Sequence, residues 1–206
     1  MKKSTLTLFV AIVATVSTSS LALASRAFAQ HDPMPHAAMQ HGDMKMGMSG
    51  MMSLKQLSGQ QFDIAFLSQM IPHHQGAVKM SQDALPTLKN EHVKKHAQKI
   101  IADQKKEIAE MQSLLRNDYK TKPSSDQMIL MKNDMQAMMA MKMAGDRAFL
   151  QMMIPHHQGA NEMSRLALQK SKSSKIRSLA QRILKAQTAE IKDFQNLLKS
   201  GNLAGA

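Results

Sequence analysis

The chain of 206 residues contains no cysteine and no tryptophan, and it has a single tyrosine. Without cysteine, no disulfide can cross-link the fold, and no thiolate can act as a nucleophile or bind a metal. With so few aromatic rings, the chain lacks the stacking platforms on which single-stranded nucleic acids bind. Aromatic and β-branched residues are also too few to indicate β-strands. The sequence therefore predicts an all-α protein that does not bind nucleic acid. Its net charge of +12 is expected on solvated helix surfaces.

Long apolar runs are also scarce. The main one, residues 6–16, follows Lys2 and Lys3 and is too short to span a bilayer. Small residues and the sequence "AFA" at 27–29 come next. This pattern predicts a secretory signal peptide, residues 1–29, that is cut after Ala29. Since no other stretch is apolar enough for a membrane span, we expect export to the periplasm, or release outside the cell.

The sequence contains an internal repeat with an offset of 83 residues. Residues 63–115 align without a gap on residues 146–198, and 26 of these 53 positions are identical. The octapeptide "MIPHHQGA" occurs in both copies, at 70–77 and at 153–160. Two copies of one unit should therefore build one domain.

Each unit has the apolar periodicity of two helices. In the first helix of the first unit, the residues on the outer face are expected to be Gln69, Gln75, Lys79 and Gln82. Two such helical hairpins can bury their apolar faces against each other as a four-helix bundle with a pseudo-twofold axis. This axis can bring the two histidine motifs near each other. The predicted organisation is a signal peptide at 1–29, a flexible Met/His-rich tail at 30–57, hairpins at 58–117 and 145–200, and a Met-rich connection at 118–144. The connection is expected to be either an added helix or an extension of the third helix.

Methionine is the residue present in excess, with 21 copies. In each unit a methionine lies one helical turn before the histidine pair, and another lies two turns after it. Imidazole binds several transition metals, whereas the soft thioether favours Cu(I) and, by the same softness, Ag(I). The mixed set predicts a Cu(I) site that also accepts Ag(I). Cu(II) is a further candidate ligand of the chain, at His31 and the amino terminus that cleavage after Ala29 would leave. The candidate ligands are Met70, His73, His74, Met80, Met153, His156, His157 and Met163.

Other roles for these residues remain open at this point. Inward methionines are usually core filler, and one histidine of each pair could serve only to orient a helix. The repeated Glu107 and Glu190, at the edge of the inward face, could accept a hydrogen bond from a metal-bound histidine. Asp63 and Asp146 are repeated as well, and could either support the site or cap a helix.

The segment after the signal peptide repeats the pattern H-x-x-M-x three times from His31, and further methionines follow. A five-residue period fits neither a helix nor a strand, and Gly, Pro and Asp favour flexibility. Core packing therefore does not explain these methionines, and we expect a flexible tail that binds soft metals. Its candidate ligands are His36, Met39, His41, Met44, Met46 and Met48.

The doubled motif M-I-x-H-H-x-x-A, with a helical hairpin behind each copy, resembles a ferritin-like family of exported bacterial proteins long catalogued as a domain of unknown function. The resemblance runs from about Asp63 to Leu198. It implies a four-helix bundle, Cu(I) and Ag(I) binding by methionine and histidine, and a role in copper resistance. The positions that carry over are the eight candidate ligands of the two units.

Two rival functions follow from the same features. A ferritin-like di-iron oxidase would need Glu-x-x-His on two helices, and that spacing does not occur in the chain. A basic module for anionic surfaces would show strong salt dependence and no response to metals. We therefore expect a copper buffer or carrier without enzymatic activity, and an envelope copper exporter or sensor is its candidate partner.

Overall fold

A computed structural model describes residues 48–141, 144–201 and 203, and this part of the chain contains helices but no strand. The all-α prediction is therefore confirmed. The predicted signal peptide and most of the predicted tail lie outside the described residues. No helix in the described ranges is long and apolar enough to cross a membrane. The helices are α1 (Met48–Gln56), α2 (Gly59–Ala84), α3 (Glu91–Asn117), α4 (Ser125–Met139), α5 (Asp146–Lys170) and α6 (Ser174–Lys199), with a short 3-10 helix, η1, at Leu85–Thr87.

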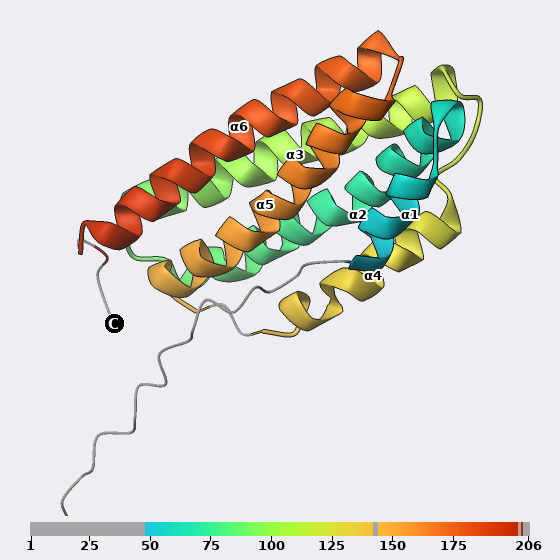
Figure 1. Ribbon diagram of the computed structural model, residues 1–206. Coiled ribbons are helices and arrows are strands. Elements are labelled where there is room, and N and C mark those ends of the chain that lie inside the picture. Colours follow the sequence, from blue (N-terminus) through green and yellow to red (C-terminus); the bar gives the residue numbers. More distant parts are fainter. Residues whose placement is uncertain (1–47, 142–143, 202, 204–206) are drawn as a thin grey trace, which may run out of the picture. The chain divides into compact units, whose positions relative to one another are not determined.

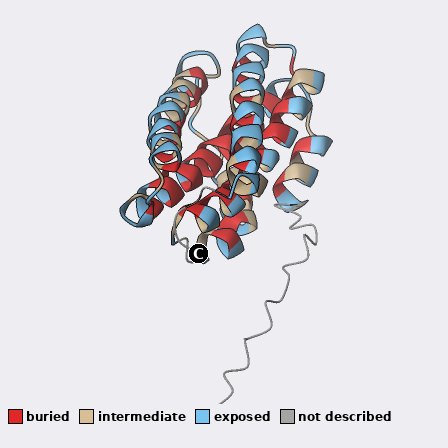
Figure 2. Cartoon of the chain, turned by 90° about the vertical axis from the view of Figure 1, so that its left-hand side faces the viewer, coloured by how far each residue is buried: buried red, intermediate tan, exposed pale blue. Residues whose placement is uncertain are grey.

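Four long helices form the bundle as two hairpins, α2 with α3 and α5 with α6 (Figure 1). The second helix of each hairpin begins at a capping side chain. Asn90 accepts hydrogen bonds from the backbone N–H groups of His92 and Val93, and Ser173 accepts one from Ile176. Such caps satisfy amides that have no partner within the helix. The buried residues lie on the sides of the helices that face the interior of the bundle, and the exposed residues face outward (Figure 2).

The two hairpins meet through α2 and α5, which run in opposite directions (Figure 1). Residues packed between the helices form two apolar core clusters. One contains Phe62, Phe66 and Met70 of α2, and the other contains Ala77 and Met80 of α2. The histidine pairs of α2 and α5 lie in sequence between the residues of these two clusters, so the fold places them in the middle of the bundle.

Helices α1 and α4 lie against the outside of α2 (Figure 1). The predicted tail reached residue 57, but residues 48–56 form α1. The predicted connection contains a separate helix, α4, which ends at Met139 before α5 begins at Asp146, so it does not extend the third helix of the bundle. Gln69 donates hydrogen bonds to the carbonyl of Gly50 and to Gln127, and the N–H of Gly50 donates to Asp134. A Cβ at Gly50 would lie 2.7 Å from the Gln69 Oε1 atom, so a larger residue there would displace the Gln69 side chain from its present position.

The two repeated aspartates have structural partners. Asp146, at the start of α5, accepts hydrogen bonds of 3.0 Å from the backbone N–H groups of Lys89 and Asn90. Its carboxylate thus holds the loop before α3, and neither supports a histidine nor caps its own helix. Asp63 accepts a hydrogen bond of 2.9 Å from the Tyr119 hydroxyl. Both aspartates therefore join separate elements of the fold.

The Tyr119 contact gives a test of the fold in solution. Burial raises the pKa of Tyr119 to about 12, and the hydrogen bond to Asp63 adds to this effect. Because the folded-state pKa lies above the ordinary value of 10.0, this contribution to stability is complete below the unfolded pKa and is lost as the pH rises through the folded pKa. Ultraviolet titration of the single tyrosine should give a midpoint near 12 in the native protein and near 10 in denaturant. Asp63→Asn should lower the native midpoint, and an unchanged midpoint would contradict the contact.

Candidate metal centre

His73 of α2 and His156 of α5 meet where the two helices cross. Their ring centroids are 3.9 Å apart, and both side chains are buried, with exposed fractions of 1% and 0%. Because α2 and α5 are antiparallel, the repeat brings equivalent residues together around one point. The sequence predicted that the two histidine motifs could meet, and the structure brings His73 and His156 into contact.

Neither ring has a hydrogen bond of ordinary geometry at either nitrogen. Burial holds the pKa of His73 and of His156 well below the usual value, and the neighbouring histidines lower it further. An interaction with the backbone of the other histidine raises the pKa of each ring, but by less than burial lowers it. Both imidazoles are therefore neutral near pH 7. Neutral buried rings without partners are costly for folding, and their lone pairs are free to bind a metal.

His74 and His157 are held by carboxylates of the second helix in their own hairpin. The Nε2 atom of His74 lies 2.8 Å from Glu107, and that of His157 lies 2.9 Å from Glu190. Burial lowers the pKa of His157 despite the opposing effect of Glu190, so the neutral ring donates its Nε2 proton to the carboxylate. In both residues Nδ1 is buried and without a partner. A carboxylate on one nitrogen and a free lone pair on the other is the arrangement that orients metal-binding histidines.

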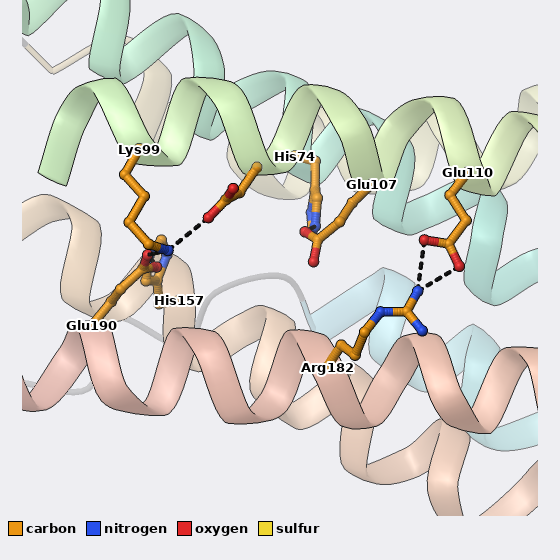
Figure 3. Close-up of polar contacts among 8 residues, drawn as sticks. His74, Lys99, Glu107, Glu110, His157, Arg182 and Glu190 are labelled. Atoms are coloured by element: carbon orange, nitrogen blue, oxygen red, sulfur yellow. Dashed lines mark hydrogen bonds and ion pairs between the residues drawn. The ribbon is translucent and has the colours of Figure 1, made fainter.

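Ion pairs cross between α3 and α6 beside these carboxylates (Figure 3). Lys99 of α3 lies 3.1 Å from Glu190 of α6, and Arg182 of α6 lies within 2.6 Å of Glu110 of α3. The pKa of Glu190 is lowered because His157 and Lys99 outweigh the effect of burial. Sequence analysis missed these cross-links. The only signal was that Lys99 and Arg182 occupy equivalent, basic positions in the two repeats.

The four candidate methionines of the repeats are buried and divide between the two core clusters. Met70 and Met163 belong to the first cluster, and Met80 and Met153 belong to the second. Each cluster thus contains one methionine from each repeat, as expected for antiparallel helices that cross at the histidines. The thioethers flank the crossing in both directions along the bundle.

The candidate ligands of the tail fall largely outside the described residues. His36, Met39, His41, Met44 and Met46 precede them, and Met48 is the first residue of α1. In the part of the chain that the structure describes, no group of three or more His, Asp or Glu side chains is placed to hold a metal ion. The side chains that surround the crossing include the buried thioethers of Met70, Met80, Met153 and Met163.

Comparison with known proteins places the chain in context. The DUF305 family, a domain of unknown function, matches residues 13–115 and 116–198. Curated protein sequences give no significant match. The chain is similar to CopM in its Cu(II)-bound form, with 31% identity over 67% of this chain and 96% of CopM, and a TM-score of 0.58. The Cu(I)-bound form of CopM gives 32% identity, 68% and 97% coverage and the same TM-score.

A DUF305 protein of Streptomyces coelicolor, described as one expected to be secreted, is also similar. It is 25% identical over 70% of this chain and 96% of its own length, with a TM-score of 0.58. CopM structures with bound silver give TM-scores of 0.58 as well. These relatives confirm the resemblance that the doubled histidine motif indicated.

Proposed function

The chain belongs to the DUF305 family, and on this premise we propose that it is a copper-binding protein of the bacterial envelope. The observation that carries the proposal is the buried contact between His73 and His156, whose four ring nitrogens lack hydrogen bonds of ordinary geometry. A group that is costly to bury unpartnered is most simply explained by a ligand that completes it. The CopM neighbours, solved with Cu(I), Cu(II) and silver, support copper as that ligand.

The proposed ligands are the histidines of the crossing and the thioethers around it. His74 and His157 are oriented by Glu107 and Glu190, which leaves each Nδ1 atom free. The buried site excludes water and suits Cu(I), with Ag(I) as its mimic. The further proposed ligands are Met70, Met80, Met153 and Met163 in the bundle, and His36, Met39, His41, Met44, Met46 and Met48 before it.

The proposed role is to sequester or carry copper in the periplasm and so to contribute to copper resistance and homeostasis. An envelope exporter or sensor is the proposed recipient, and Cu(II) is a second state that histidines can bind. We propose binding without catalysis, because the Glu-x-x-His spacing that a di-iron oxidase needs does not occur in the chain.

Competition between metals tests this function. The exported chain, titrated anaerobically with Cu(I) against a chromophoric chelator, should bind Cu(I) and retain it in excess Zn(II), because thioether sulfur discriminates against zinc. A chain that begins at Met48 is the control: it lacks the tail, so the ions it retains belong to the bundle. Tight Zn(II) binding by the bundle together with no Cu(I) binding would exclude the proposed function.

A further inference from the structure

Helix α4 covers α2 at the level of the histidine crossing. A surface cavity of about 590 Å³ lies between the two helices, and residues of α2 and α4 line it. On the α2 side are Pro72 and Gly76, and on the α4 side are Met135 and Met139. Met135 is buried and Met139 is partly buried. Two thioethers therefore lie in the wall of the cavity. Gly76, in the opposite wall, lies about one helical turn after His73 in α2.

Gly76 separates this cavity from His156. The point where a Cβ atom of residue 76 would lie is 3.5 Å from His156 Nε2 and 3.5 Å from Met139 Sδ, and it would overlap the methyl group of Met135. The imidazole nitrogen and the Met139 sulfur are therefore at most twice that distance, 7 Å, from each other. The absence of a side chain at residue 76 is what lets the methionines of α4 approach the histidine of α5.

These atoms have the chemistry and the reach of a soft-metal site. His156 Nε2 is buried and without a hydrogen bond of ordinary geometry. Metal–sulfur and metal–imidazole bonds are about 2.3 and 2.0 Å long, so an ion in line between the two atoms would span about 4.3 Å. Methionine has three rotatable bonds and adapts to such a distance. Of the two lysines at the cavity, Lys79 is paired with Asp83 at 2.8 Å, and Lys132 is exposed.

We propose that Met135 and Met139 of α4, together with His156 Nε2, bind Cu(I) or Ag(I) at the floor of this cavity, and that the ion passes Gly76 to the buried histidines when the Met135 methyl group moves aside. The inference rests on the proposed copper function and deepens it, because it assigns sulfur ligands outside the two repeats and a side from which the ion arrives. Only one repeat supplies this route, because α4 packs on α2 and makes no comparable contact with α5.

The competing explanation is that Gly76 and the methionines serve close helix packing alone, since glycine commonly permits such approach. Replacing Met135 and Met139 together by leucine separates the two roles. Exchange of methionine for leucine conserves volume and usually costs less than about 1.5 kcal/mol of stability, but it removes both sulfur atoms. Met131→Leu is the matched control, because Met131 is a buried residue of the same helix that does not line the cavity.

The measurement is Ag(I) binding by the exported chain, with a competing chelator, combined with X-ray absorption of the Cu(I)-loaded protein. In the Met135→Leu/Met139→Leu variant we expect the tightest Ag(I) affinity to fall at least about ten-fold, comparable to the loss of other site groups. The number of sulfur neighbours of copper should also decrease.

Gly76→Ala, checked for folding by thermal unfolding, should slow the loading of Ag(I) into the protein. Binding, loading and sulfur count equal to those of the Met131→Leu control would overturn this site while leaving the copper function intact. If the unmodified chain binds neither ion, both proposals fail.

Discussion

Replacing His73 and His156 together by leucine is expected to stabilise the metal-free protein and to remove its response to copper. In the metal-free state the four nitrogens of the two buried imidazoles lack hydrogen bonds of ordinary geometry, and each unsatisfied buried group costs about 1–3 kcal/mol. Leucine is of similar size and needs no partner. We therefore expect the free energy of unfolding to rise by about 2 kcal/mol, which corresponds to about 4–8 °C in melting temperature for a domain of this length.

With copper bound, the unmodified chain should become more stable than the double leucine variant. A ligand present at 1,000 times its dissociation constant stabilises the folded state by about 4 kcal/mol, or about 8–16 °C here. The unmodified chain should show a shift of this size with Cu(I) or Ag(I), and the double leucine variant should show little of it. Differential scanning calorimetry with and without Ag(I) measures both quantities. A variant that is less stable without metal, or that retains the full shift with metal, would place the metal site away from the crossing.

Replacing Asp146 by alanine is expected to be the most destabilising single change outside the hydrophobic core. Its carboxylate is 1% exposed and accepts two backbone hydrogen bonds of 3.0 Å, from Lys89 and Asn90. Hydrogen bonds to charged groups contribute about 1.5–3 kcal/mol each, and alanine would also leave the two amides without these acceptors. We expect a loss of about 3 kcal/mol, or about 6–12 °C in melting temperature.

Asp83→Ala is the matched control for this experiment. Asp83 lies in α2 and pairs with Lys79 at 2.8 Å, but both side chains are more than half exposed. Exposed pairs of this kind contribute about 0.3–0.5 kcal/mol, so the control should hardly change the unfolding midpoint in urea. Equal effects of the two substitutions would show that the contact of Asp146 with the loop before α3 is not formed in solution.

Features carried by periodicity could be predicted from the sequence. The repeat indicated two helical hairpins, and its symmetry indicated that the two histidine pairs could meet. The position of Glu107 and Glu190 at the edge of the inward face also indicated a partner for a histidine, and each carboxylate contacts the histidine of its own hairpin. These features depend on spacing within one helix or on the symmetry between two, and both can be read along the chain.

Contacts across helices of unrelated sequence could not be predicted in this way. Gln69 was expected on the outer, solvated face of its helix, but it is buried because Gly50 of α1 and Gln127 of α4 accept its amide protons. Nothing in its own helix signals those partners. The same limit applies to Asp146, whose partners are backbone amides of a loop that lies 56 residues or more before it.

The cover that α4 provides makes the two halves of the repeat unequal. Pro72 and Gly76 are buried beneath it, whereas their counterparts in the second copy, Pro155 and Gly159, are only half-buried. The octapeptide is identical in the two copies, but α4 packs on only one of them. The same substitution at equivalent positions of the two copies, 83 residues apart, should therefore have different effects on stability. Mutational tolerance should be broader in the second copy of the motif, where a larger side chain meets solvent, than in the first, where it meets α4.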